Sequence, residues 1–264
     1  MSVVVQKSHL DWIIGWIADD QHTEDSNIQR FRDNNELFFC LRSIQQFAPY
    51  IRTIHIILGR DSRPPNWLTT HPKINLIKES SLYSPVQPNS ETKKLYYHKI
   101  PGIANYFMTS DDDMFLVNTL VKSDCFSNNI PILNSVGYCI ARKGAAFADD
   151  NGHIPLIWKK THYELAVNQL DDSLFQNAGK KRYNPWIEMK RFLLSHDYVL
   201  KGNVKCPGVF INDTNVINIE CIYNEFLSTY FFGKLSNKFM CINDDFDRTS
   251  SVNYQKQYLY LRSF

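Results

Sequence analysis

The sequence lacks a metal-binding cysteine pattern, a marked excess of positive charge and a long apolar run, and each absence excludes a class of protein. Its six cysteines form no C-x-x-C pair, so a zinc site is not expected. A net charge of +2, with no basic cluster to strengthen the case, argues against nucleic acid as a partner. No run approaches the roughly 20 apolar residues that a membrane-spanning helix needs.

The length and the chain start set the expected organisation. The 264 residues contain no repeat, low-complexity tract or linker, so we expect a single catalytic domain over residues 1–264. Residues 1–7 are too short, and too unlike a charged region followed by an apolar one, to form a secretory signal. Without such a signal, the cysteines are expected to be reduced thiols. We therefore expect a cytoplasmic protein, at most peripheral at the inner face of the membrane.

Three apolar stretches in the first third of the chain predict strands, and one amphipathic segment predicts a helix. Residues 9–17 are apolar without alternation, which is typical of a parallel strand buried on both faces. Residues 53–58 and 73–78 are shorter stretches of the same kind. The helix is expected to be capped by Asp33, with Glu36 three residues further on. This β-α-β-β order predicts an α/β fold.

The most unusual stretch is a run of three carboxylates between two apolar segments. Residues 106–108 predict a short buried strand, Asp111, Asp112 and Asp113 follow, and residues 114–116 return the chain to the interior. Adjacent acids beside a low-dielectric interior repel one another, and a hard cation such as Mg²⁺ relieves that cost. A solvated acidic turn, or a helix start with extra charge, is the structural alternative.

A similar signal recurs near the end of the chain, where apolar residues 239–242 precede Asn243 and Asp244. Between the two acidic stretches, the pattern predicts a strand at residues 136–141 and helices at residues 157–176 and 185–200. We expect residues 153–200 to form a helical subdomain within the single domain, covering the sheet.

A series of motifs, in order along the chain, resembles the Stealth family. RFRDNNEL at residues 30–37, LRSI at 41–44 and FAPYIR at 47–52 closely resemble the second conserved region of that family. Further matches are PPNWL at 64–68, HKIPG at 98–102, DDMFL at 112–116 and CIND at 241–244. Residues 10–17 look like the first region of the family, and HIP at 153–155 looks like part of the third. The resemblance covers most of the chain.

The resemblance implies a function and a fold. Stealth proteins are sugar-1-phosphate transferases of bacterial capsule synthesis, related to the lysosomal N-acetylglucosamine-1-phosphotransferase. Such a protein is expected to move a hexose 1-phosphate from a UDP-sugar to a sugar hydroxyl, with Mg²⁺ or Mn²⁺ as cofactor. The expected fold is α/β, with a mostly parallel sheet like that of nucleotide-sugar-binding transferases of the GT-A or Rossmann-like type, and a helical insertion. The expected partners are the UDP-sugar donor, a saccharide acceptor and a membrane-associated polysaccharide-assembly complex of capsule or exopolysaccharide synthesis.

The matched motifs also assign the residues that handle the metal and the proton. Asp112 and Asp113 are expected to bind the metal, with Asn243 and Asp244 completing the site from the second acidic strand end. His153 is the candidate general base for the acceptor hydroxyl, because imidazole titrates near neutrality. His98 is a second candidate, either for a donor phosphate or as a structural hydrogen-bonding residue.

The phosphates and the nucleotide are assigned to the remaining candidates. Arg32 and Arg182 would contact phosphate, although Arg182 also fits a solvated basic turn. Asn34, at a helix start, suits an anion site but also suits a helix cap. Arg42 could bind the nucleotide, or could pair with an acid of its own helix. Asp11 and Trp16 are expected to line the nucleotide pocket, and the neighbouring Trp12 is expected in the core.

Several positions depart from the family pattern. Gly15 and Ala18 stand where the family has Thr and Asp, and Asp111 stands where it has Asn. Residues 91–94, which end in Lys94, replace the usual His-Ala-Ile-Glu, and the Arg-x-x-x-Glu/Asp pattern is met only loosely by Arg182 and Glu188. Two other functions therefore stay open. One is a metal-dependent glycosyltransferase that releases UDP, because a strand followed by aspartates also holds Mn²⁺ against UDP in that fold. The other is a non-catalytic binding subunit of a polysaccharide-assembly complex.

Overall fold

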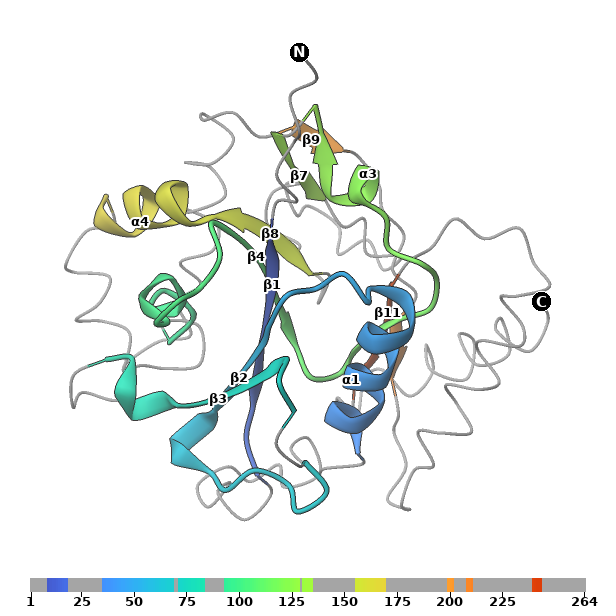
Figure 1. Ribbon diagram of the computed structural model, residues 1–264, viewed down its shortest axis with the longest axis vertical. Helices are drawn as coiled ribbons and strands as arrows, with labels where there is room; N and C mark the ends of the chain where they lie inside the picture. Colours follow the sequence, from blue (N-terminus) through green and yellow to red (C-terminus); the bar gives the residue numbers. More distant parts are fainter. Residues whose placement is uncertain are drawn as a thin grey trace.

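A computed structural model describes residues 9–18, 35–68, 71–83, 93–128, 130–134, 155–169, 199–201, 208–210 and 239–243. Its main feature is a five-stranded sheet in the order β3-β2-β1-β4-β8 (Figure 1). Four strands are parallel: β1 (Leu10–Trp16), β2 (Ile54–Leu58), β3 (Ile74–Lys78) and β4 (Tyr106–Asp111). β8 (Leu156–Lys159) is antiparallel to β4 at one edge. The predicted α/β class and the mostly parallel sheet are confirmed.

The sheet is buried on both faces, which explains why its first strand is apolar without alternation. Trp12, Ile14 and Trp16 of β1 lie in the core cluster that contains helix α1 (Glu36–Phe47). Ile13 lies in a second cluster, which contains Tyr163 of helix α4 (Lys160–Asn168). Because successive side chains of a strand point to opposite faces, α1 and α4 cover opposite faces of the sheet (Figure 1).

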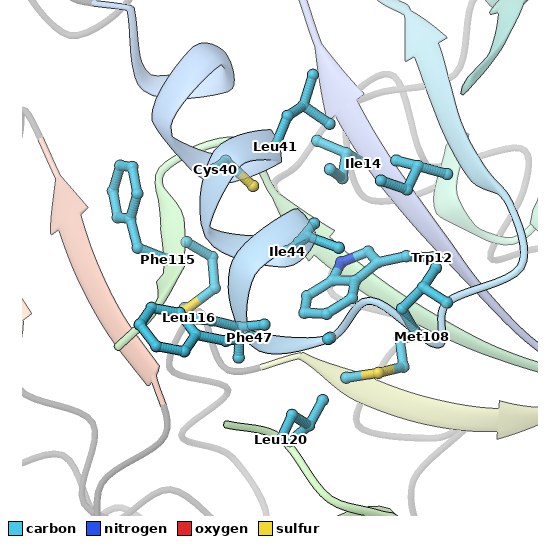
Figure 2. Close-up of a cluster of buried hydrophobic side chains, with 14 of the residues drawn as sticks. Trp12, Ile14, Cys40, Leu41, Ile44, Phe47, Met108, Phe115, Leu116 and Leu120 are labelled. Atoms are coloured by element: carbon cyan, nitrogen blue, oxygen red, sulfur yellow. The ribbon is translucent and has the colours of Figure 1, made fainter. Parts of the chain in front are cut away.

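Helix α1 packs one apolar stripe against the sheet. Its buried side chains include Leu37, Leu41, Ile44 and Phe47, at the spacing that the sequence predicts. Figure 2 shows Leu41 and Ile44 beside Ile14 and Trp12 of β1.

The start of α1 differs from the prediction. The helix begins at Glu36, and Asn35 occupies the N-cap position with φ of 68°. Asn tolerates this left-handed conformation better than most residues, which favours a helix start after Asn35. Asp33, the expected cap, lies outside the described residues.

After β4 the chain turns at Asp112 and Asp113 and forms β5 (Met114–Leu116). β5 pairs antiparallel with β11 (Phe239–Asn243), which is parallel to β10 (Gly208–Phe210). The backbone N–H of Leu116 donates to Ser43 Oγ of α1 at 3.0 Å, which fixes β5 against that helix. The remaining elements are α3 (Lys122–Cys125), β6 (Phe126–Ser127), β7 (Ile130–Asn134), β9 (Val199–Lys201), and the short helices η3 (Gly59–Asp61), η4 (Glu79–Ser81) and η5 (Tyr97–Lys99).

The predictions for residues 153–200 are partly wrong. Residues 157–159 belong to strand β8, and the helix begins only at Lys160. Pairing with β4, together with a 2.9 Å hydrogen bond from Trp158 Nε1 to Thr109 Oγ1, overrides the local helical pattern. Residues 199 and 200 also form a strand instead of a helix end. The strand predicted at residues 136–141, most of the second helix and most of the helical subdomain lie outside the described residues.

Two further observations concern the described part of the chain. It contains no helix that is long and apolar enough to cross a membrane. Cys40 and Cys125 are buried free thiols there.

Candidate active site at the carboxyl edge of the sheet

The strand order marks one edge of the sheet as a binding site. From β1 the chain continues to β2 and β3 on one side, whereas β4 lies on the other side of β1. In open α/β sheets, ligands bind outside the carboxyl ends of the strands at this reversal of order. Gly15, near the end of β1, is opposite Asp111, the last residue of β4. Asp111, Asp112 and Asp113 therefore lie at the edge of the sheet where a ligand is expected to bind.

The side chains of this acidic turn have different partners. Asp111 Oδ1 lies 3.1 Å from Lys94 Nζ, and the two residues form an ion pair. Burial raises the pKa of the Asp112 carboxyl well above its usual range, and the charges of Asp113, Glu36 and Asp111 raise it further. Asp112 is thus a carboxylate whose neighbouring charges are mainly those of other acids.

Glu36 is a site residue that sequence reasoning missed. The sequence analysis used it only as a helix-capping residue, but it is buried at the first position of α1 and its charge acts on Asp112. Cys40 lies about one turn further along α1. Burial raises its pKa, and the charges of Asp112 and Asp113 add to that increase. Asp112 and Asp113 therefore lie near the first two turns of α1. In the sequence, the feature that could have indicated a role for Glu36 is its position beside a buried leucine at the start of a helix.

The second acidic strand end comes to the same edge of the sheet. Cys241 of β11 is opposite Met114 of β5 in an antiparallel pair. Because the pair is antiparallel, the end of β11 at Asn243 extends from this position toward the acidic turn that precedes β5. The backbone thus brings the end of β11 beside the acidic turn, although the two segments are far apart in the sequence. Asp244 lies outside the described residues.

Asp11 has a structural position instead of the predicted place in a nucleotide pocket. It is fully buried near the amino end of β1, about four residues or 13 Å along the strands from the level of Asp111. Arg52 donates from Nε to Oδ1 at 2.8 Å and from Nη2 to Oδ2 at 2.5 Å. The N–H of Ala104 donates to Oδ2 at 2.8 Å, and His55 Nε2 lies 3.0 Å from the same oxygen.

These contacts make Asp11 the centre of an ion-pair network that joins the amino ends of three strands. Burial alone would raise the pKa of Asp11, but the hydrogen bonds with His55, Arg52 and Ala104 outweigh it and lower the pKa to about 2. Asn75 Nδ2 lies 3.1 Å from His55 Nδ1. With that amide as donor, Nδ1 accepts and Nε2 carries the proton that His55 donates to Asp11. The oxygens of Asp11 are therefore bound within the protein, away from the carboxyl edge of the sheet.

Three other predicted site residues have contacts within the fold. Trp16 is buried in the core cluster that contains α1. His98, in η5, packs beside the ring of Tyr163 at a centroid distance of 5.6 Å, and burial lowers its pKa despite the opposing effect of the Leu95 backbone. Arg42 is exposed on α1, with its guanidinium 5.5 Å from the centroid of the Phe38 ring.

The sequence of this region matches a known family model. Residues 30–132, which include α1, the strands β2, β3 and β4, and the acidic turn, match the model of Stealth protein conserved region 2. The chain therefore carries a region similar to conserved region 2 of the Stealth proteins.

Several curated proteins resemble this chain. It is 40% identical over 155 residues to the exopolysaccharide phosphotransferase CpsY of Mycobacterium tuberculosis, which covers 57% of the chain and 25% of CpsY. It is 26% identical over 275 residues to a capsular polysaccharide phosphotransferase of Actinobacillus suis, which covers 90% of the chain and 73% of that protein. The chain thus spans only about a quarter of the length of the mycobacterial relatives that it matches.

The fold of the chain resembles that of known glycosyltransferases. A crystal structure of the galactosyltransferase LgtC with donor and acceptor sugar analogues superposes with a TM-score of 0.50, covering 96% of each chain at 10% identity. A second LgtC structure, that of an active-site mutant, gives a TM-score of 0.51 at 7% identity, covering 95% of each chain. At these identities the likeness shows the fold alone, which is the α/β fold of these glycosyltransferases.

The donor set of the acidic turn fits one kind of metal site. Among the described residues, no group of three or more His, Cys, Asp or Glu side chains is arranged to hold a metal ion by itself. Mg²⁺ does not need such a group, because it is usually bound by one or two carboxylates together with water and substrate phosphates. Asp112 and Asp113, with Glu36 nearby, supply oxygen ligands and negative charge of this kind.

The remaining predicted site residues lie outside the described part of the chain. These are Arg32, Asn34, His153, Arg182 and Asp244. Their roles stay predictions from the sequence.

Proposed function

We propose that this protein transfers a hexose 1-phosphate from a UDP-sugar to a sugar hydroxyl, in capsule or exopolysaccharide synthesis. The observation that carries the proposal is the acidic turn, Asp112 and Asp113, at the carboxyl end of β4 and beside the start of α1. The names of the relatives, phosphotransferases of exopolysaccharide and capsular polysaccharide, support the reaction class. The UDP-sugar donor is our inference from the nucleotide-sugar-binding fold.

In the proposed site, Asp112 and Asp113 hold Mg²⁺ or Mn²⁺, with Asn243 and Asp244 on the other strand end. The metal supplies charge neutralisation of the pyrophosphate. The carboxylates lie in a partly desolvated position where like charges raise the pKa of Asp112. A bound cation removes that repulsion, so the site is electrostatically prepared for a metal that arrives with its phosphate ligand.

The proposed reaction breaks the pyrophosphate. The acceptor hydroxyl oxygen attacks the sugar-side phosphorus, the bond between that phosphorus and the bridging oxygen breaks, and UMP leaves with the bond electrons. His153 is proposed to take the hydroxyl proton. Arg32 and Arg182 are proposed to stabilise the charge on the transferred phosphoryl group, with Asn34 at the helix start. The product is a phosphodiester that retains one phosphorus.

The same acidic turn also suits glycosyl transfer, the reaction of the structural neighbours. In that reaction the bond between the anomeric carbon and oxygen breaks, and UDP leaves intact. The arginines of the matched regions favour phosphoryl transfer, because a phosphoryl group under attack needs cations around the sugar-side phosphate as well as the metal. The third alternative, a binding subunit without catalysis, would retain the acidic turn but release no nucleotide. The cytoplasmic location and the polysaccharide-assembly complex stay predictions.

The nucleotide product tests the proposal. Purified protein is incubated with a panel of UDP-sugars, a saccharide acceptor and Mn²⁺, and the nucleotides are separated by chromatography. We expect UMP and a ³¹P phosphodiester signal in the saccharide product. UDP as the sole nucleotide product would replace the proposal with glycosyl transfer, and no nucleotide release with any donor would favour the binding subunit.

A further inference from the structure

Asp111, the first acid of the turn, forms an ion pair with a residue from a different segment of the chain. Lys94 Nζ lies 3.1 Å from Asp111 Oδ1. The lysine side chain is 21% exposed, so the pair is partly shielded from solvent on that side. The two residues are 17 positions apart, and the contact exists because the chain before η5 packs against the end of β4.

Lys94 and its neighbour Lys93 make separate contacts. The hydroxyl of Tyr163 in α4 donates to the backbone carbonyl of Lys94 and holds the backbone there. From this position the Lys94 side chain reaches the acidic turn. Lys93 pairs with a different acid, since its Nζ lies 2.6 Å from Oε1 of Glu79, which is buried in η4.

The partners of the aspartates separate their tasks. Asp111 pairs with Lys94, in the segment before η5, whereas the charges that act on Asp112 are those of Asp113, Glu36 and Asp111. We propose that Lys94 is a positioning residue that holds Asp111 away from the metal ligands and cancels its charge. Asp112 and Asp113 then bind the metal with the donor pyrophosphate as its further ligand. The inference rests on the proposed function, because it concerns the metal of that same site.

Loss of the ammonium group has two measurable consequences. Asp111 becomes an additional negative group beside the turn, so free Mn²⁺ binds more tightly. The same negative charge repels the donor pyrophosphate, so KM for the UDP-sugar rises. An effect of about fivefold on each constant corresponds to one unit charge about 8 Å from a doubly charged group in a water-like dielectric.

The experiment compares four variants of the full chain. Lys94→Gln removes the cation, and Lys94→Arg retains it. The double variant Lys94→Gln/Asp111→Asn removes both charges, so the pair stays neutral as it is in the unmodified chain. Lys93→Gln is the matched control, because it breaks the neighbouring ion pair with Glu79 and leaves the turn intact. Mn²⁺ affinity is measured by calorimetry without donor, KM is measured from nucleotide release, and thermal unfolding checks the fold.

We expect Lys94→Gln to tighten Mn²⁺ binding and to raise KM by about fivefold each, and Lys94→Arg to match the unmodified chain. The double variant should return both constants to within about twofold of the unmodified chain. Lys93→Gln should lower the melting temperature and leave both constants unchanged. The inference is overturned if Lys94→Gln changes only the melting temperature, if Lys93→Gln shifts the constants equally, or if the double variant fails to recover them. An unmodified chain that binds no Mn²⁺ and releases no nucleotide would overturn the proposed function together with the inference.

Discussion

Asp11 and Asp112 lie at opposite ends of the same parallel sheet, and they differ in the charges that surround them. Asp11, at the amino edge, is bound by Arg52, by His55 and by a backbone N–H, and its pKa falls to about 2 although burial alone would raise it. Asp112, at the carboxyl edge, has other acids as its charged neighbours, and both burial and these charges raise its pKa.

The difference separates a structural carboxylate from a functional one. A buried carboxylate whose oxygens are all bound by the protein stabilises the fold and offers nothing to a ligand. A desolvated carboxylate beside like charges destabilises the fold, and an external cation can remove that cost. The predictions below test this contrast, from the largest expected effect to the smallest.

The acidic turn should matter most for catalysis. Asp112→Asn and Asp113→Asn are each expected to lower turnover on the order of 10³-fold, because each removes a proposed metal ligand. The fold should survive, since each substitution removes charge from a repelling cluster. Nucleotide release and circular dichroism measure the two effects. Glu164→Gln is the control, because Glu164 is exposed on α4 and forms a 3.9 Å pair with Lys160 of the same helix. Turnover of either Asn variant at the unmodified rate would remove these residues from the mechanism.

Asp11 should matter most for stability. Asp11→Asn is expected to lower the free energy of unfolding by about 3 kcal/mol, because it removes the buried negative charge and leaves a single acceptor oxygen for Arg52, His55 and the Ala104 N–H. Arg52→Gln should cost less, since the guanidinium is 37% exposed and water can replace it in part. Urea unfolding at pH 7 measures both variants. A loss below about 1 kcal/mol for Asp11→Asn would mean that the network contributes little.

The same network predicts a pH dependence with a definite sign. The pKa of Asp11 is about 2 in the folded chain and 3.8 as the reference value for the unfolded chain. Its stabilisation is therefore complete above about pH 4 and is lost as the pH falls toward 2. The shift corresponds to about 2 kcal/mol. Urea midpoints between about pH 2 and 5 should show this contribution in the unmodified chain and lack it in Asp11→Asn. Parallel curves for the two proteins would contradict the assignment.

The smallest expected effect is a gain in stability when Asp112, at the carboxyl edge of the sheet, is replaced. The folded pKa of Asp112 lies above its unfolded value, so its ionisation at neutral pH costs stability. Without divalent metal, Asp112→Asn is expected to raise the free energy of unfolding by about 1 kcal/mol. The measurement is urea unfolding at pH 7 in the presence of a chelator. Destabilisation by Asp112→Asn under these conditions would show that this carboxylate is structural, like Asp11.

Local patterns were sufficient to predict the elements that frame the site. Each of these patterns lies within a short stretch of sequence. They are the buried run of β1, the helical spacing of Leu37, Leu41 and Ile44, and the acids at the end of β4. Strand β8 was not predicted, because its residues 157–159 fit the start of a helix. Only the pairing with β4 favours the strand.

The roles of individual polar residues depend on contacts that spacing does not reveal. The ligands of Asp11 come from residues 41 to 93 positions away, so nothing near Asp11 in the sequence distinguishes it from a binding residue. The same holds for the pair of Lys94 with Asp111 and for the effect of Glu36 on Asp112. The acidic turn itself was predictable because its three carboxylates are adjacent.

The contrast between the two carboxylates is tested most directly by Mn²⁺ binding to three proteins in one calorimetric experiment. The unmodified chain, Asp11→Asn and Asp112→Asn are titrated at a temperature at which all three are folded. The account predicts that Asp11→Asn binds Mn²⁺ like the unmodified chain and that Asp112→Asn loses binding. Equal affinity of Asp112→Asn and the unmodified chain, or loss of binding in folded Asp11→Asn, would contradict it.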